Sequence, residues 1–384
     1  MANKTNCTIN GQGYYRIRAK IGSNERGKPI MKPFYGTGKK DAEIQRDTYL
    51  DSIKAGLDMD LAKLTVASAM KSWLFEVKRV DNDLKASSFE RYECIFRKAI
   101  DGSDLAAMLV PAVKSIHIQR LLNSLAEKGS THSQMKNTLK VVKMFFIYAT
   151  EEGYTLKNPC PKSITIPGTK PKKYEIETFT MPEVEKIKKC LSGNRLRFLI
   201  LLALGTGMRK GEILAIKYSD IRDSKIHIHS SLTIPTVVDR AGKRTRAMVV
   251  GEPKSDASTR VIPFPKELIK ELKAHRARQL VERMAIGLGG ESEYIFTTET
   301  GHLCDPKNIY TAYGRLLKKA GVPDRKFHAL RHTYATVLVR SGIVPLSVVQ
   351  KLLGHEKIET TMIYVHTNME DMTDAVKVLN VLLK

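Results

Sequence analysis

Residues 352–366 read LLGHEKIETTMIYVH, and this stretch decides how the C-terminal half of the chain is interpreted. Leu352 and Leu353 suit the last turn of a helix, and Gly354 suits its end, because glycine adopts the left-handed conformation that closes many helices. His355 follows directly, and Tyr364 comes nine residues after it. A tyrosine in this position either packs in a core or acts as a nucleophile, and the rest of the sequence has to decide between the two.

Net charge is the most informative property of the composition. The 384 residues include 64 Lys+Arg and 40 Asp+Glu, a formal net charge of +24 at pH 7. Such a potential attracts polyanions, of which nucleic acid is the commonest in a cell. The sequence has no basic amphipathic anchor and no apolar run of about 18 residues, so we expect no membrane partner. It also has no signal-peptide core, so we expect a cytoplasmic protein.

The sequence lacks the motifs of metal and cofactor enzymes. It has no Walker loop, no G-x-S-x-G, no H-E-x-x-H and no carboxylate cluster of the two-metal type. The cysteines form no C-x-x-C pair, which indicates reduced thiols and no zinc: Cys7, Cys94, Cys160, Cys190 and Cys304. We therefore expect no metal and no cofactor. Any chemistry on nucleic acid then needs arginine to neutralise the phosphate, since a guanidinium donates two parallel hydrogen bonds and stays charged.

Residues 1–60 predict a small sheet beside one helix. In GYYRIRAKI the alternate positions Arg16, Arg18 and Lys20 share one strand face, and the apolar positions share the other. Residues 40–55 then follow a helical pattern. The basic strand face suits a module that contacts DNA, and a merely solvated face explains it equally well.

Residues 62–158 predict a bundle of helices. Thr65 can cap the first helix, and Ser87 with Glu90 has the spacing of a capping box. The next segment, residues 159–177, holds four prolines and four lysines and predicts a basic, semi-extended linker that could lie along a phosphate backbone.

Residues 178–384 predict a mixed but mainly α domain that begins with a capping box at Thr180 and Glu183. Several short strand-like segments predict a small antiparallel sheet. Residues 237–250, VVDRAGKRTRAMVV, predict a basic hairpin that either follows phosphates or is a solvated loop. The fold class that we predict is multidomain and mainly α with small antiparallel sheets.

Four residues in this domain are candidates for phosphate chemistry. Arg209 follows GTGM at a helix start, where free N–H groups also favour an anion. His328 and Arg331 lie three residues apart on a helix and therefore share one face. Lys254 lies in a turn between two predicted strands and could donate a proton to a leaving 5′ oxygen. Taken singly, a lone arginine at a helix start is usually a surface residue, and a lysine in such a turn is usually only a loop lysine. His332 is explained as a packed residue.

The order of these residues resembles the tyrosine recombinase (phage-type integrase) family. That pattern consists of G-M-R-K-G-E at 207–212, a hairpin lysine, H-x-L-R-H at 328–332, L-G-H at 353–355 and a tyrosine nine residues on. The helical segment resembles the core-site DNA-binding domain of that family. The N-terminal piece looks like the arm-site binding domain of integrases from conjugative transposons and temperate phages.

The resemblance implies six catalytic residues, which are Arg209, Lys254, His328, Arg331, His355 and Tyr364. In that family the arginines clamp the scissile phosphate, and the lysine is the general acid for the 5′-hydroxyl. The histidines donate to the phosphate or assist proton transfer, and the tyrosine attacks the phosphorus to give a 3′-phosphotyrosyl link. Glu212 is expected to brace Arg209. A tyrosine has an ordinary pKa near 10, so the surrounding cations must help to form or stabilise its anion.

The implied function is site-specific recombination that integrates and excises a mobile element or prophage in a bacterial cell. The implied partners are double-stranded DNA at core and arm sites, three further copies in a homo-tetramer on DNA, and an excisionase or DNA-bending helper. The tail after Tyr364 carries an apolar stripe, which either folds back or docks on a neighbouring protomer as a trans-docking helix: Met372, Val376, Leu379 and Leu383. The alternatives are a type IB-like topoisomerase, a non-catalytic DNA-binding regulator and a chromosome-dimer resolvase, which lacks the extra N-terminal module.

Overall fold

The computed structural model describes residues 5–23, 28–58, 60–168, 176–253 and 256–365. The chain forms two compact units. The first consists of Met1–Lys172 together with Thr236–Thr245, and the second of Lys173–Pro235 together with Arg246–Lys384. Among the described residues, no helix is both long and apolar enough to cross a membrane.

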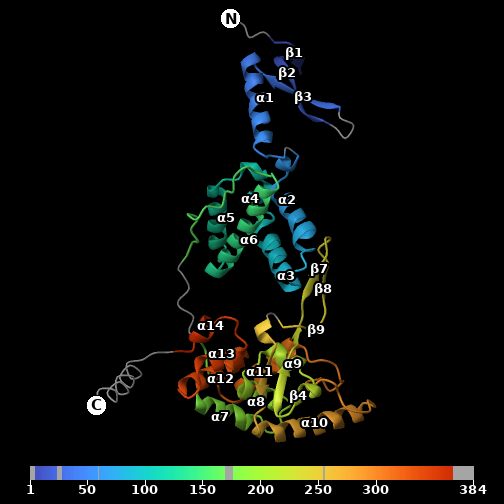
Figure 1. The fold of residues 1–384 in the computed structure, drawn as a ribbon, viewed down its shortest axis with the longest axis vertical. Helices are drawn as coiled ribbons and strands as arrows, with labels where there is room; N and C mark the ends of the chain where they lie inside the picture. The colour runs from blue at the N-terminus through green and yellow to red at the C-terminus, as the bar shows by residue number, and fades with distance from the viewer. Residues whose placement is uncertain (1–4, 24–27, 59, 169–175, 254–255, 366–384) are drawn as a thin grey trace, which may run out of the picture. The chain divides into compact units, whose positions relative to one another are not determined.

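The N-terminal part of the first unit is a three-stranded antiparallel sheet covered by one helix (Figure 1). Its elements are β1 (Cys7–Ile9), β2 (Gln12–Ser23), β3 (Pro29–Gly36) and α1 (Lys39–Lys54). The predicted alternation along β2 is confirmed, because Arg16, Arg18 and Lys20 are exposed and the residues between them are partly buried. The covered face packs on α1, where Phe34 meets Tyr49 edge to face with ring centroids 5.2 Å apart.

The rest of the first unit is the predicted helical bundle. Its elements are α2 (Val66–Ser72) with its π-helical extension (Trp73–Lys78), α3 (Ala86–Ile95) with its π-helical extension (Phe96–Ile100), α4 (Asp104–Ala107), α5 (Ser115–Glu127) and α6 (His132–Glu151). Trp73, Phe145 and Phe146 are fully buried at its centre. The Thr65 cap is confirmed, since its hydroxyl accepts from the Ser68 N–H at 3.2 Å.

Two predictions at the edges of this bundle need correction. Helix α3 begins at Ala86, so Ser87 does not cap it. The Glu90 carboxylate accepts instead from Arg244 at 3.1 Å. The first residues of the predicted linker also pack on the bundle, because Cys160 is buried in its core and Gln119 bonds the Thr165 backbone.

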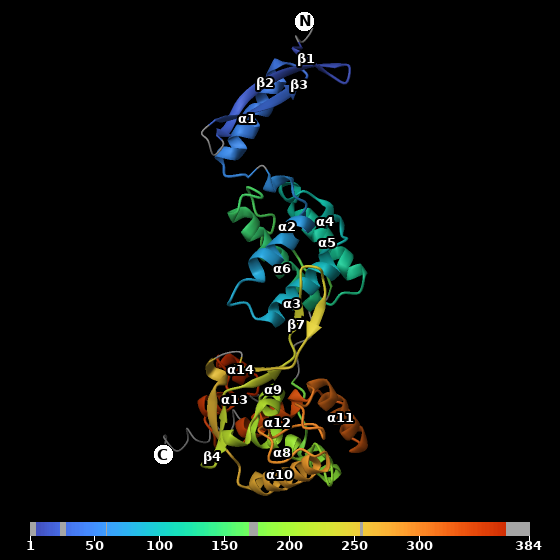
Figure 2. The same cartoon turned by 90° about the vertical axis from the view of Figure 1, so that its right-hand side faces the viewer.

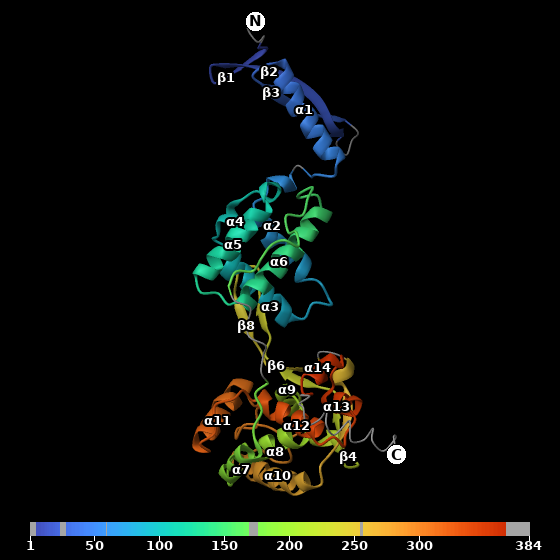
Figure 3. The same cartoon turned by 90° about the vertical axis from the view of Figure 1, so that its left-hand side faces the viewer.

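A hairpin from the C-terminal half of the sequence completes the first unit. It consists of β7 (Thr236–Val238) and β8 (Arg244–Arg246), and all three views place it beside α3 (Figures 1, 2 and 3). Val238 is 1% exposed in the core of the bundle. Arg244 donates to Glu93 at 2.7 Å, and Arg240 donates to Glu76 at 2.6 Å. These two arginines therefore attach the hairpin to the bundle, a role that neither sequence interpretation anticipated.

The second unit is mainly helical, with short antiparallel strands. Its helices are α7 (Met181–Cys190), α8 (Arg197–Thr206), α9 (Lys210–Ala215), α10 (Glu267–Ala285), α11 (Pro306–Lys319), α12 (His328–Arg340), α13 (Leu346–Leu353) and α14 (Glu359–Met362). Its strands are β4 (Ile221–Arg222), β5 (Lys225–Ile228), β6 (Ser231–Thr233), β9 (Val249–Gly251) and β10 (Arg260–Pro263). One sheet has the order β10-β5-β4, and β6 pairs with β9.

Helix α12 occupies the middle of this unit and contacts both α8 and α13 (Figure 3). The capping box at Thr180 and Glu183 is confirmed at the start of α7. The predicted break after α8 is also confirmed, because Gly207 is left-handed with φ of 63° and a Cβ there would meet the Tyr334 ring at 2.4 Å. Lys254 and residues 366–384, which include the predicted docking helix, lie outside the described residues.

Candidate active site

The turn that ends α13 organises the candidate site. Gly354 closes the helix with φ of 65°, a conformation that strains other residues. The surrounding atoms also leave no room for a side chain, because a Cβ would meet the Ala257 carbonyl oxygen at 2.8 Å and the Arg260 guanidinium at 3.0 Å. The backbone carbonyls of Leu353 and Gly354 accept hydrogen bonds from two arginines that are distant in the sequence.

Arg209 is the first of these arginines and precedes the short helix α9. Its Nη2 donates to the Gly354 carbonyl at 3.0 Å, and its Nη1 donates to Ser258 at 3.0 Å and to Glu212 at 2.8 Å. The side chain is 35% exposed. A fixed guanidinium that solvent still reaches can bind an incoming anion.

Arg331 is the second arginine and lies one turn into α12. It is 2% exposed, and its two terminal nitrogens donate to the carbonyls of Gly207 and Leu353, each at 2.7 Å. Its Nε–H is buried without a hydrogen-bond partner in the described structure. Burial, with the nearby charge of Arg209, lowers the pKa of Arg331 to about 9, which leaves it cationic at neutral pH.

Glu212 holds the cationic side of the site in place. It is 2% exposed and accepts from Arg209, as predicted, through both the side chain and the backbone N–H. It also accepts from Arg260, at 3.2 and 3.0 Å. Burial alone would raise the pKa of Glu212, but the hydrogen bonds and charges of the two arginines outweigh burial and lower it. Arg260 in turn donates to the Leu352 carbonyl at 2.8 Å, so one carboxylate links both arginines to the turn after α13.

Two predicted histidines flank this cluster and are neutral at neutral pH. His328 begins α12, and burial, followed by the charges of nearby cations, lowers its pKa to about 4. His355 follows the turn, and its Nδ1 lies 3.0 Å from the Thr361 hydroxyl. Burial, with Arg331 as the next cause, lowers the pKa of His355 to about 3. A neutral imidazole can donate one hydrogen bond without adding charge.

Tyr364 lies at the other side of the turn. The side chain is 2% exposed and packs with Ala335, Val349 and Leu353. Its hydroxyl oxygen is 2.8 Å from Nδ1 of His332. Its ring is nearly parallel to that of His355, with centroids 6.4 Å apart. The phenol is therefore buried between two histidines of the same unit.

A cavity of about 420 Å³ opens between α9 and the turn after α13. Its lining combines guanidinium, imidazole and hydroxyl groups with backbone: Arg209, Glu212, Ser231, Pro253, Ser258, Gly354, His355, Glu356, Lys357 and Thr360. This lining offers several hydrogen-bond donors to an anion.

The structure brings five of the six predicted residues into one region of the second unit, and the sixth, Lys254, lies outside the described residues. Sequence reasoning missed Arg260 and treated His332 as packed. The signal for His332 was present, since it lies four residues after His328 and therefore on the same helix face. Nothing in the sequence pointed to Arg260, because its role depends on a carboxylate 48 residues away.

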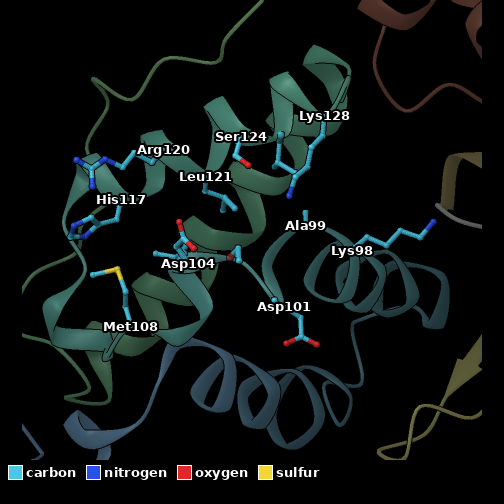
Figure 4. A pocket seen from close by; sticks show the side chains of 14 residues that line it. Lys98, Ala99, Asp101, Asp104, Met108, His117, Arg120, Leu121, Ser124 and Lys128 are labelled. Carbon is cyan, nitrogen blue, oxygen red and sulfur yellow. The ribbon is translucent and has the colours of Figure 1, made fainter.

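A second hollow, of about 380 Å³, lies in the helical bundle (Figure 4). Lys98, Arg120, Lys128 and His117 line it together with Asp101 and Asp104, among others. Its charges are mixed, and no tyrosine or cysteine is among its described lining residues. In the described part of the chain, no group of three or more His, Cys, Asp or Glu side chains is placed to hold a metal ion.

Comparison with known proteins finds relatives of this chain. The model of the Phage integrase family matches residues 177–371. A curated relative named tyrosine recombinase XerC-like, from Caldanaerobacter subterraneus subsp. tengcongensis, is 44% identical over 390 residues and covers 99% of each chain. Tyrosine recombinase XerA of Pyrococcus furiosus is 28% identical and covers 68% of this chain and 80% of that protein.

Solved structures agree in fold. The Tn1549 transposon integrase in complex with transposon right end DNA has a TM-score of 0.64 at 20% identity, with 83% of this chain and 100% of that chain covered. A lambda integrase dimer bound to a COC′ core site has a TM-score of 0.56 at 17% identity, with 95% of each chain covered. These likenesses confirm the predicted multidomain, mainly α fold with small antiparallel sheets.

Proposed function

The chain belongs to the phage integrase family of tyrosine recombinases, enzymes that cut and rejoin DNA without a metal requirement, and from this premise we propose that it integrates and excises a mobile DNA element or prophage. The observation that carries the proposal is the convergence at one turn. Arg209 and Arg331 both donate to the Leu353–Gly354 turn, and Tyr364 packs against the same turn. A phosphodiester placed at this turn meets two guanidiniums and a phenol.

In this proposal the arginines clamp the scissile phosphate. Arg209 keeps an exposed face, and Arg331 has a buried Nε–H that a phosphate oxygen can satisfy. Because the site is partly closed to water, each donor to the developing phosphorane contributes about 3–4 kcal/mol, by analogy with oxyanion-hole deletions. His328 and His355 donate to the same oxygens or assist proton transfer.

Tyr364 supplies the nucleophile. Its oxygen attacks the phosphorus, the bond from phosphorus to the 5′ oxygen breaks, and Lys254 gives that oxygen a proton. The product is a 3′-phosphotyrosyl ester and a free 5′-hydroxyl. The ester keeps the energy of the phosphodiester in the protein, so a 5′-hydroxyl of another strand can reverse the step without ATP.

We assign the DNA contacts to two parts of the first unit. The helical bundle binds the core site next to the cleaved phosphate. The N-terminal module binds the arm site through Arg16, Arg18 and Lys20, which line the exposed face of β2. Phosphate contacts of this kind position a protein on DNA without reading its sequence. Replacing these three residues with glutamate is expected to abolish binding to arm DNA and to leave binding to core DNA intact.

The assembly that we propose is a homo-tetramer that joins two DNA duplexes, with the segment after residue 365 docking on a neighbouring protomer. An excisionase or DNA-bending protein would set the direction. Deleting residues 370–384 is expected to preserve binding to a single half-site and to eliminate the tetrameric complex, as measured by light scattering. An intact tetramer after the deletion would refute this role of the tail.

Resolution of chromosome dimers is the second candidate function. The Xer names of the curated relatives favour it. The N-terminal module separates this chain from the XerA relatives, which match only 67–68% of it, but not from the XerC-like relative, which matches 99% of it. The mobile-element proposal is supported instead by the fold shared with the DNA-bound Tn1549 and lambda integrases. Assays on the two kinds of DNA separate the candidates, since a resolvase recombines sites near the chromosomal terminus and an integrase recombines the ends of its element.

A covalent-trapping assay tests the proposed function. The full-length protein is incubated with duplexes from the element's ends or from the chromosomal terminus, each nicked beside the scissile phosphate so that the cleaved strand diffuses away. Denaturing gels with and without EDTA compare the wild type with Tyr364→Phe. We expect an EDTA-resistant adduct on element DNA that is lost in the phenylalanine variant.

The other outcomes identify the alternatives. An adduct on terminus DNA alone supports the resolvase. Relaxation of supercoiled plasmids that carry no specific site indicates a type IB-like topoisomerase. Tight binding to element DNA without any adduct would refute the recombinase and identify a regulator.

A further inference from the structure

His332 lies within hydrogen-bond distance of the proposed nucleophile, Tyr364, and we propose that it is the general base of the reaction. In this inference, which rests on the proposed function, His332 accepts the proton of the Tyr364 hydroxyl as the oxygen attacks phosphorus. It returns the proton when the strand is rejoined. The family pattern offers His328 and His355 for phosphate donation or proton transfer, and it does not include His332.

The geometry of the pair carries the inference. Nδ1 of His332 lies 2.8 Å from the Tyr364 oxygen, within the range for a proton transfer. The two residues come from different elements, since His332 lies on α12 and Tyr364 follows α14. Both are fixed by their surroundings. Tyr364 is 2% exposed, and His332 is half-buried with its ring against that of His328, centroids 4.6 Å apart.

The protonation state of His332 suits a base. Burial, followed by the charge of Arg331, lowers the pKa of His332, and Glu177 opposes this shift. The remaining groups that face it are His328 and Tyr364. The imidazole is therefore neutral at neutral pH, and with its hydrogen on Nε2 it accepts from the phenol through Nδ1. An imidazolium could not accept.

The other two histidines are poorer candidates for this step. Nδ1 of His355 already lies 3.0 Å from the Thr361 hydroxyl. Burial, with the adjacent cations, lowers the pKa of His355 to about 3 and that of His328 to about 4, so both are weak bases. Their neutral rings instead suit donation to phosphate oxygens.

The step balances without a further reactant. The O–H bond of Tyr364 breaks and its proton moves to Nδ1 of His332, which becomes imidazolium. The phenolic oxygen forms its bond to phosphorus, and the bond from phosphorus to the 5′ oxygen breaks. The 5′ oxygen then takes a proton from the general acid. The scissile phosphate brings a negative charge beside the new imidazolium, which offsets the repulsion from Arg331.

The test compares His332→Asn and His332→Ala with the wild type in single-turnover cleavage of the nicked duplex. Asparagine keeps a hydrogen-bond acceptor near the position of Nδ1 but has no basicity. We expect both variants to slow cleavage by about 100-fold, the lower end of general-base effects, with thermal unfolding and DNA affinity unchanged. If His332→Asn cleaved at the wild-type rate, the proposed proton transfer to His332 would be overturned, because a hydrogen bond to the tyrosine alone would then suffice.

Two further readouts separate a base from a structural residue. The wild-type rate should fall as the pH falls through the lowered pKa of His332, and this acidic limb should be absent in His332→Asn. Replacing Tyr364 with a fluorinated tyrosine, whose phenol is more acidic, should shrink the penalty of His332→Ala. A penalty that is independent of phenol acidity would overturn the proposal.

A third possibility is that His332 only holds the tyrosine away from DNA. In that case His332→Ala would cleave faster than the wild type, which also overturns the proposal. If the wild type itself forms no adduct, the proposed function fails first. If the wild type forms an adduct and both variants match it, only this inference fails.

Discussion

Replacing Glu212 with glutamine removes a buried negative charge that holds two arginines of the site. The carboxylate is 2% exposed, and its partner Arg260 is 7% exposed. Glutamine keeps the shape and one acceptor oxygen but turns an N–H₂ group toward a guanidinium. We expect the second unit to lose stability and the clamp to lose its alignment.

The magnitude follows from the burial of each pair. Removing one partner of a buried ion pair costs about 3–5 kcal/mol, because the other charge stays buried. Arg209 is 35% exposed, so its share is screened and adds little. The retained acceptor places the total near the lower bound, at about 3 kcal/mol. For a unit of this size each kcal/mol shifts Tm by about 2–4 °C, so Tm should fall by about 6–12 °C.

Scanning calorimetry of the full chain measures this shift. The quantity compared is the Tm of the transition that differs between the wild type and Glu212→Gln. The matched control is Glu185→Gln, because Glu185 pairs with Lys188 at 2.9 Å on the surface, where the two side chains are 57% and 44% exposed. The control should shift Tm by no more than about 2 °C. A Glu212→Gln shift as small as that of the control would refute the assigned role of the carboxylate.

The pH dependence gives an independent check. The folded pKa of Glu212 lies below its ordinary value of 4.5, so its contribution to stability is complete above pH 4.5 and is lost as the pH falls through the folded pKa. The stability difference between wild type and Glu212→Gln should therefore be constant from neutral pH to about 4.5 and shrink only below it. A difference that declines already between pH 7 and 5 would contradict the direction of this shift.

Three further predictions concern the turn, the source of the tyrosine and the hairpin. Gly354→Ala places a Cβ against Arg260 at a position with a left-handed backbone. Adduct formation should therefore fall by about 100-fold while DNA binding stays unchanged. A wild-type cleavage rate would contradict the close packing described at Gly354. Because one chain holds both the phenol and the clamp, a mixture of Tyr364→Phe and Arg209→Ala proteins on one DNA should form no adduct, and a recovered adduct would mean that a neighbour delivers the tyrosine. Glu93→Gln should weaken the attachment of the hairpin by about 1 kcal/mol, so tryptic cleavage within the hairpin should rise about fivefold. Unchanged cleavage would show that apolar packing alone holds it.

Local sequence signals predicted local structure well. The caps at Thr65 and Thr180 depend on residues three positions away, and the alternation along β2 depends on every second residue. The capping box at Ser87 failed for a nonlocal reason. Glu90 has the right spacing, but its carboxylate pairs with Arg244, 154 residues further along the chain.

The candidate site shows the same difference between local and nonlocal signals. The motif order indicated the chemistry, and the i,i+3 spacing placed His328 and Arg331 on one face. The contacts that fix the site join distant segments, such as Arg209 with Gly354 and His332 with Tyr364. No periodicity encodes such pairs, because they arise only when the start of α9, α12, α13 and the turn after α14 pack together.

The hairpin of residues 236–245 has a consequence for biosynthesis. The helical bundle buries Val238 in its core and places Glu93, itself 5% exposed, against an arginine of this hairpin. On the ribosome the bundle therefore emerges long before the strand that completes it. A fragment that ends at residue 172 would leave an apolar slot open and would remove Arg244 from Glu93, which keeps its pair with Arg97 at 3.0 Å. Supplying residues 236–245 as a peptide should fill the slot and return Arg244 to the carboxylate.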